Sequence, residues 1–181
     1  MKTKPYLTVC VTLIAAALTG CSAESKKSPN VSEAIRTSLD QAGFKDVSVS
    51  QDREKGVVTL GGHVASESDR AQAEAIAKPY APGQVVSDQI AVIPPGAESD
   101  AKAIISDVDA GIEKNLDAAL IQNRLNKRVK PSVKNGVVTL TGDVRTQARR
   151  EQAQSIAAGV PNVRQVVNEI QVKDQKATSS R

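Results

Sequence analysis

One nine-residue phrase occurs twice in the chain and limits the folds open to it. Residues 56–64 read GVVTLGGHV and residues 136–144 read GVVTLTGDV, a separation of 80 positions. When residues 56–92 are laid over residues 136–172 without gaps, 15 of the 37 positions are identical. Most of the identical positions are aliphatic or glycine, whereas the polar positions differ. The repeat therefore predicts two copies of one supersecondary unit.

The apolar spacing within each copy predicts the order α-β-β-α-β. Apolar residues four positions apart predict an opening helix, at Val31, Ile35 and Leu39 in the first copy and at Val108, Ile112, Leu116 and Leu120 in the second. We expect the second of these helices to begin near Ser106. A short strand, the repeated phrase as a second strand, another helix and a last strand follow. Because a β-α-β crossover is right-handed, both helices should cover one face of a three-stranded sheet. Each copy is thus predicted to be a small α+β domain.

Four glycines delimit the repeated phrase, namely Gly56, Gly62, Gly136 and Gly142. Gly56 and Gly136 end dipeptides typical of hairpin turns, and the Asn-Gly pair is the stronger signal because both of its residues tolerate positive φ. Gly62 and Gly142 lie inside the strand, where glycine permits a bulge or a close approach to a helix. We predict a structural role for all four.

The N-terminal segment has the features of a secretory signal. Lys2 and Lys4 precede an apolar run of 14 residues, too short to cross a hydrocarbon core about 30 Å thick. Residues 18–21 read LTGC, which resembles the bacterial lipobox. That resemblance implies that Cys21 carries a diacylglycerol and an acyl chain such as palmitate. Ser22, which follows Cys21, implies the outer membrane if the host is Gram-negative. An ordinary signal with a coincidental cysteine is the alternative.

Composition divides the remainder of the chain. The stretch IPPGAESDA, residues 93–101, interrupts the apolar pattern with two prolines and a glycine and indicates a linker. The predicted order is a signal peptide (1–20), a lipidated polar tether (21–29), domain 1 (30–93), a linker (94–102), domain 2 (103–173) and a disordered tail (174–181).

Residue types that carry catalysis or bind metals are scarce. His63 is the single histidine of the chain, and Asp143 replaces it in the second copy. Cys10 lies within the signal and Cys21 would be acylated, so no free thiol or disulfide is expected in the mature chain. No phosphate-loop motif occurs. We predict that the protein is not an enzyme, and that it holds no metal and no cofactor besides the acyl groups on Cys21.

Three sequence features together resemble the BON domain (bacterial OsmY and nodulation). They are the frame GVVTLxGxV, a helix with Ala-x-x-Ile-Ala, and VVNEIQV at residues 166–172. A lipobox followed by two such domains is similar to the DolP-like lipoproteins of the bacterial outer membrane, which are related to periplasmic OsmY. The resemblance implies a lipid-anchored protein on the periplasmic face of the outer membrane. It also implies binding to phospholipid membranes and a part in envelope integrity under osmotic stress.

Charge is distributed unevenly between the copies. Residues 21–100 hold 8 basic and 12 acidic residues, whereas residues 101–181 hold 14 basic and 8 acidic. We predict that anionic headgroups bind the basic residues of the second copy, namely Arg124, Lys127, Arg128, Lys130, Lys134, Arg145, Arg149 and Arg150. Three alternatives stay open: a merely solvated surface, docking of the acidic copy on the basic one, and an adaptor that binds envelope proteins. Nucleic acid is not expected as a partner, because the chain is exported and has few aromatic residues for base stacking.

Overall fold

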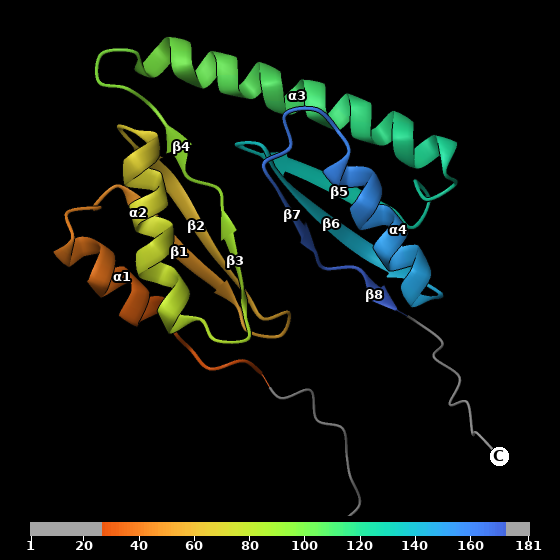
Figure 1. The fold of residues 1–181 in the computed structure, drawn as a ribbon, viewed down its shortest axis with the longest axis horizontal. Coiled ribbons are helices and arrows are strands. Elements are labelled where there is room, and N and C mark those ends of the chain that lie inside the picture. The colour runs from red at the N-terminus through yellow and green to blue at the C-terminus, as the bar shows by residue number, and fades with distance from the viewer. Residues whose placement is uncertain (1–26, 173–181) are drawn as a thin grey trace, which may run out of the picture.

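The structure, a computed structural model, describes residues 27–172 and shows two units of the same architecture (Figure 1). Domain 1 comprises α1 (Ser32–Gln41), β1 (Val47–Asp52), β2 (Val57–Val64), α2 (Glu67–Ala77), the short 3-10 helix η1 (Lys78–Tyr80), β3 (Val85–Asp88) and β4 (Ala91–Val92). Domain 2 comprises α3 (Glu98–Gln122), β5 (Val129–Lys134), β6 (Val137–Val144), α4 (Gln147–Ala158), β7 (Gln165–Asn168) and β8 (Gln171–Val172). The predicted α+β class with two tandem repeats is confirmed. The signal peptide and Cys21 lie outside the described residues.

Each sheet is built around the strand that contains the repeated phrase. In domain 1, β2 pairs antiparallel with β1 and parallel with both β3 and β4. The two parallel strands are successive stretches of one last strand, interrupted at Gln89 and Ile90, so each sheet has four strands rather than the expected three. At the interruption, Asp88 Oδ1 accepts a hydrogen bond from Ile90 N at 3.2 Å. Asn168 makes the same contact with Ile170 in domain 2.

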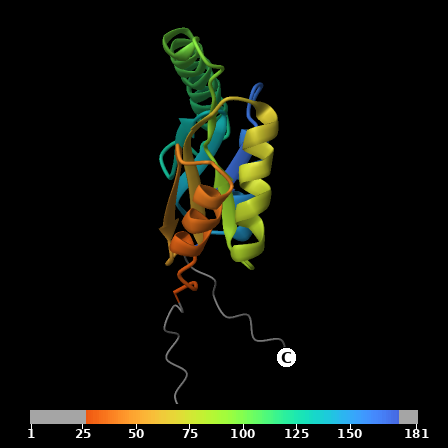
Figure 2. The same ribbon diagram turned by 90° about the vertical axis from the view of Figure 1, so that its left-hand side faces the viewer.

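Both helices of a domain cover the same face of its sheet, as Figure 2 shows for α1 and α2. Alternate residues of β2, Val58 and Leu60, point to this face and are fully buried. They meet Ile35 and Leu39 of α1 and the small residue Ala73 of α2, whose size allows a close approach of the helix to the sheet. Domain 2 has the equivalent core. Aliphatic packing of this density supplies most of the stability of so small a domain.

Gly62 and Gly142 take left-handed conformations, with φ of +88° and +119°. A Cβ at Gly62 would lie 1.9 Å from the carbonyl oxygen of Asp46, and one at Gly142 would lie 2.0 Å from that of Arg128. The close neighbour is therefore the backbone of the turn before the first strand, and not a helix, which was one of the two expected alternatives. No residue other than glycine fits this contact.

Helix α3 begins earlier than predicted. It starts at Glu98 rather than near Ser106 and runs for 25 residues, whereas α1 has 10. Residues 98–102 of the predicted linker 94–102 are therefore helical. Pro95 is the last proline before the helix. The acidic residues Glu98 and Asp100 lie in its first turn, where the helix dipole favours them. The sequence from Glu98 onward contains nothing that would end a helix.

The end of the predicted tether also belongs to domain 1. Ser28 N donates to Arg53 O at 2.8 Å, and Gln51 Nε2 donates to Pro29 O at 2.7 Å. Residues 28 and 29 therefore lie along the β1–β2 hairpin, because their backbone groups find partners there. Domain 1 begins by Ser28 rather than at Asn30.

The two domains pack together on the sheet faces that the helices leave uncovered. Val57 of domain 1 is buried against Val137 and Val167 of domain 2, and β3 lies against β7. Gln165 of β7 hydrogen-bonds the backbone of β3, since its Oε1 accepts from Asp88 N at 2.9 Å and its Nε2 donates to Val86 O at 2.7 Å. The two copies therefore dock, but through valine side chains and not by covering the basic residues of the second copy, as the open alternative supposed.

Candidate functional site

Six of the predicted basic residues gather at one end of domain 2, where α3 ends and α4 begins. This group, called the basic end below, consists of Arg124, Lys127, Arg128, Lys130, Arg145 and Arg149. All six side chains are exposed. They come from the α3–β5 connection, the start of β5, the segment that joins β6 to α4, and the first turn of α4. The fold therefore brings together two charge clusters that are separated in the sequence.

The basic end surrounds two neighbouring hollows. A cavity of about 250 Å³ is lined by Arg124, Arg145 and Arg149, and one of about 600 Å³ by Lys127 and Lys130. Arg128 lines both. Asp143 is the carboxylate in this group, and its Oδ2 lies 3.5 Å from Arg128 Nη1. The excess of positive charge around open hollows is suited to binding several anionic groups at once.

Arg124 has an unusual backbone conformation, with φ of +56°. Gly43, with φ of +92°, holds the equivalent position after α1. The equivalence follows from matching hydrogen bonds, since Phe44 N donates to Leu39 O and Leu125 N donates to Leu120 O, both at 2.9 Å. A left-handed conformation costs an L-residue about 1–2 kcal/mol. Domain 2 thus has an arginine at a position where domain 1 has glycine, the residue that a left-handed conformation favours.

Domain 1 presents a different charge at the corresponding end. Asp46 stands where domain 2 has Arg128, because their carbonyl oxygens make the same close contact with Gly62 and Gly142. Asp69, at the start of α2, corresponds to Arg149 at the start of α4. The same fold therefore carries acidic residues in one copy and basic residues in the other.

The two remaining predicted residues lie elsewhere. Lys134 is at the far end of β5 and borders the space between the domains. Arg150 is partly buried, its Nη2 donates to Asn168 O at 3.1 Å, and its Nε has no hydrogen-bond partner among the described residues. Its counterpart Arg70 pairs with Asp88 across 3.4 Å. Both arginines thus brace the interrupted last strand, which explains why they are identical in the repeat.

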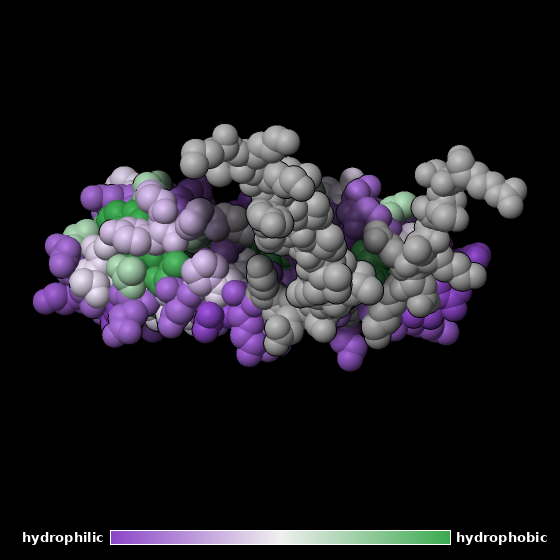
Figure 3. Space-filling model, turned by 90° about the horizontal axis from the view of Figure 1, so that it is seen from below, coloured by the Kyte–Doolittle hydropathy of each residue, from purple (hydrophilic) through white to green (hydrophobic). Residues whose placement is uncertain are grey.

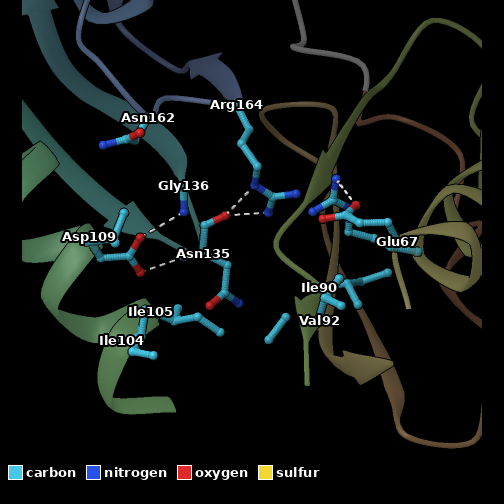
Figure 4. A pocket seen from close by; sticks show the side chains of 13 residues that line it. Glu67, Ile90, Val92, Ile104, Ile105, Asp109, Asn135, Gly136, Asn162 and Arg164 are labelled. Atoms are coloured by element: carbon cyan, nitrogen blue, oxygen red, sulfur yellow. Dashed lines mark hydrogen bonds and ion pairs between the residues drawn. The ribbon is translucent and has the colours of Figure 1, made fainter. Parts of the chain in front are cut away.

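A second candidate site, the interdomain cavity, lies between the domains (Figure 4). It has a volume of about 230 Å³. The N-terminal half of α3 forms one wall with Ile104, Ile105 and Val108, and domain 1 forms the other. Sequence reasoning missed this cavity because it placed the start of the helix near Ser106. The apolar stripe that continues from Val108 back to Ile105 and Ala101 was the available signal.

Charged groups are fixed at the edge of the interdomain cavity. Asp109 of α3 accepts hydrogen bonds from Asn135 N at 2.6 Å and Gly136 N at 2.8 Å. Arg164 Nε donates to Asn135 O at 2.8 Å. Burial, and then the charge of nearby Arg70, lower the pKa of Arg164. The two arginines at this end of the cavity therefore lie among the carboxylates of Glu67, Asp88 and Asp109, which offset their charge.

The repeated domains define a family. The BON domain model matches residues 28–94 and 108–174, which is most of the chain. The chain belongs to the BON domain family and contains two copies of the domain. Within residues 27–172, no helix is both long enough and apolar enough to cross a membrane. In the same range, no group of three or more His, Cys, Asp or Glu side chains could hold a metal ion.

Among characterised proteins, the osmotically inducible protein Y of Escherichia coli strain K12 is similar to this chain. The two are 31% identical over 137 residues, which span 75% of this chain and 67% of that protein. Two solved structures of CdsD, a structural protein of the type III secretion system of Chlamydia trachomatis, also align with 78% of this chain. Their identity is 15%, and they are covered to 96% and 91% with TM-scores of 0.35 and 0.36.

Proposed function

We propose that this protein is a lipid-anchored, non-catalytic component of the cell envelope whose domain 2 binds anionic phospholipid membranes. The observation that carries the proposal is the basic end, where six exposed cations surround two hollows. Domain 1 has the same fold without this charge. The BON fold and the similarity to an osmotically inducible protein support a role in the envelope under osmotic stress.

Anionic headgroups match the chemistry of the basic end. A basic residue close to a negatively charged bilayer contributes about 1 kcal/mol of binding free energy, so six residues together give substantial attraction. The part of the surface that grey atoms do not cover in Figure 3 is mostly hydrophilic, with small apolar patches between the polar side chains. We therefore expect domain 2 to contact the headgroups electrostatically.

The proposed anchor strengthens such contacts. An acylated Cys21 would hold the domains close to the bilayer and raise the effective concentration of headgroups around domain 2. A thioether-linked diacylglycerol together with an amide-linked acyl chain gives stable anchoring, whereas one chain alone is marginal. Because Ser22 would be the second residue of the mature chain, we propose that the protein lies on the periplasmic face of the outer membrane. Mass spectrometry of the mature N-terminus should find an acylated Cys21, and an unmodified cysteine would contradict the anchor.

Vesicle co-sedimentation tests the membrane proposal. The chain from Ser22 to Arg181, which keeps every described residue, should co-sediment with vesicles that contain anionic lipid and not with purely zwitterionic vesicles. Binding should weaken as salt is raised, because ions screen the attraction. Changing Arg124, Lys127, Arg128 and Lys130 together to Glu should abolish it.

A matched control has the same change in net charge at other positions. Lys45, Lys78, Lys114 and Lys134 are exposed and lie outside the basic end. Their combined change to Glu should retain most of the binding. If both variants lose binding equally, net charge rather than the basic end is responsible, and the site assignment is wrong.

Binding to other envelope proteins is the second candidate function. It is favoured by the apolar side chains that α3 leaves in contact with solvent, since Ile104 is 64% and Ile121 58% exposed. If the chain from Ser22 to Arg181 never binds anionic vesicles, this adaptor role becomes the better account.

A further inference from the structure

The smaller hollow of the basic end, called the arginine hollow below, is surrounded by arginine side chains. It has a volume of about 250 Å³ and is lined by Arg124, Leu125, Arg128, Val144, Arg145 and Arg149. The four arginines come from the α3–β5 connection, the segment between β6 and α4, and the first turn of α4. Their guanidinium groups therefore approach the hollow from several sides.

Most of the positive charge of the arginine hollow is not paired with carboxylates. Asp143 lies 3.5 Å from Arg128, but it lines the neighbouring hollow and not this one. Arg149 Nη1 donates to neutral oxygens, Asn123 O and Gln152 Oε1, both at 3.4 Å. Within residues 27–172, one of the four guanidinium groups is thus ion-paired. The arginine hollow differs in this from the interdomain cavity, whose arginines lie among carboxylates.

Domain 1 has a hollow of about 350 Å³ at the equivalent position. Its lining includes the six counterparts of the residues above, namely Gly43, Phe44, Asp46, Val64, Ala65 and Asp69. Of these, two are carboxylates, and the described lining also holds Lys45 but no arginine. The fold therefore forms this hollow in both copies, whereas the arginines are confined to domain 2.

The arginines occupy positions where local structure favours other residues. Arg124 has a φ of +56°, at a position where domain 1 has glycine. Arg149 lies in the first turn of α4, where the helix dipole disfavours a cation and favours an acidic residue such as Asp69 of α2. Four like charges around one hollow also repel one another. Residues that break local rules in this way are typical of functional sites.

We propose that the arginine hollow binds a phosphomonoester carried by a membrane lipid, as in phosphatidate. This inference rests on the proposed function and adds which headgroup domain 2 selects. A phosphomonoester carries about −1.5 to −2 charges at pH 7 and has three terminal acceptor oxygens, whereas a phosphodiester headgroup carries a single charge and has two. Guanidinium groups donate paired hydrogen bonds to such oxygens. The dianion would also offset the repulsion among the arginines.

Vesicles of matched surface charge test this selectivity. One set contains phosphatidate and the other phosphatidylglycerol, both in phosphatidylcholine and both adjusted to the same zeta potential. The chain from Ser22 to Arg181 should bind the phosphatidate vesicles roughly tenfold more tightly. Equal binding to the two sets would overturn the selectivity and leave the membrane proposal intact. Binding to neither set would overturn the membrane proposal and the lipid as the source of the phosphate.

Two variants with the same change in charge test the position. Arg145→Gln should remove most of the preference for phosphatidate, and the fold tolerates a neutral residue there because domain 1 has Ala65. Lys127→Gln is the matched control, since Lys127 belongs to the basic end but lines the other hollow. It should weaken binding to both sets of vesicles alike and keep the preference. Equal loss of the preference in both variants would contradict the assignment, and thermal unfolding shows whether each variant is folded.

Glycerol 3-phosphate tests the arginine hollow without a bilayer. It should shift the amide resonances of Arg124, Arg145 and Arg149 in the nitrogen-15 spectrum, and those of Gly43 and Ala65 in domain 1 should not move. Dimethyl phosphate, a phosphodiester, should bind at least roughly tenfold more weakly. Equal binding of the two compounds would overturn the selectivity. If glycerol 3-phosphate binds in the hollow and the vesicles are not discriminated, a soluble phosphomonoester is the ligand and the lipid source is wrong.

Discussion

The ammonium group of Lys55 in domain 1 lies 2.6 Å from the carboxylate of Glu169 in domain 2. A displacement of 80 positions converts this pair into Asn135 and Gln89, and Asn135 Nδ2 does donate to Gln89 O at 2.6 Å. Each domain thus donates a hydrogen bond from the same position of the repeat and accepts one at the same second position, as in an interface between two symmetric subunits. The domains pack as a pseudo-symmetric pair within one chain.

The Lys55–Glu169 pair should contribute to the packing of the domains. Its hydrogen bond to Glu169 raises the pKa of Lys55, so the contribution is complete below the ordinary pKa of 10.5 and is lost as the pH rises through the raised value. Lys55→Met should lower the free energy of unfolding by about 1 kcal/mol. Adding Glu169→Gln should recover most of this loss, because Gln89 fills the equivalent position. Urea denaturation measures both, and an unchanged midpoint in Lys55→Met would contradict the role.

The charges at the interface oppose the simplest interpretation of the sequence. An acidic and a basic copy suggest docking by net charge, yet the lysine of this pair comes from the acidic copy and the glutamate from the basic one. The contact depends instead on Val57, Val137 and Val167. The two adjacent valines of GVVTL place one apolar side chain on each face of the strand. The sequence therefore contained the evidence that both faces are buried, although it could not show what covers the second face.

Local patterns predicted the elements of each domain, and long-range packing decided the rest. Helix spacing located Ile112, Leu116 and Leu120 correctly, and all three are buried in the core. The start of α3 was misplaced because its N-terminal half serves the space between the domains and not the core of domain 2. Charge alone could not show that Arg150 and Lys134 lie outside the basic end. Arg150 contacts the last strand and Lys134 borders the space between the domains, and both contacts depend on how distant segments pack.

Gly142→Ala should destabilise the protein severely. The new Cβ would lie 2.0 Å from the carbonyl oxygen of Arg128, at a residue whose φ is +119°. We expect a loss of about 2–4 kcal/mol in the free energy of unfolding. Gly111→Ala is the control, because Gly111 is helical and its Cβ would meet nothing within 4 Å. That change should stabilise the protein by about 0.5–1 kcal/mol. A loss of similar size in both variants would contradict the account of Gly142.

Asp88→Asn should stabilise the protein at neutral pH. Burial is the main cause that raises the pKa of Asp88, although hydrogen bonding by Ile90 N and the charge of Arg70 act against it. The folded protein therefore holds this proton more tightly than the unfolded chain does, and stability falls as the pH rises above the ordinary pKa of 3.8. Asn168 occupies the same position in domain 2 and keeps the equivalent hydrogen bond, since its Oδ1 accepts from Ile170 N at the interruption of the strand.

Urea midpoints at pH 4 and pH 7 test this. The wild-type chain should lose more stability between the two pH values than Asp88→Asn does. A matched change at an exposed carboxylate, Glu151→Gln, should leave the wild-type pH dependence in place. If Asp88→Asn is less stable than the wild type at pH 7, the attraction to Arg70 outweighs the cost of burial.

Arg124 should lower the stability of the protein while strengthening its binding to membranes. Its φ of +56° is left-handed, and glycine adopts positive φ about as readily as negative φ, as Gly43 does in domain 1. Arg124→Gly should therefore raise the free energy of unfolding by up to about 1 kcal/mol. It should also weaken binding to anionic vesicles by roughly fivefold, the loss expected for one basic residue at the surface.

The reciprocal change Gly43→Arg is the control, and there is free space for its Cβ. It should cost about 1 kcal/mol of stability without improving vesicle binding, because domain 1 lacks the other cations of the basic end. If Arg124→Gly binds vesicles as well as the wild type does, the strained arginine serves no purpose at the membrane.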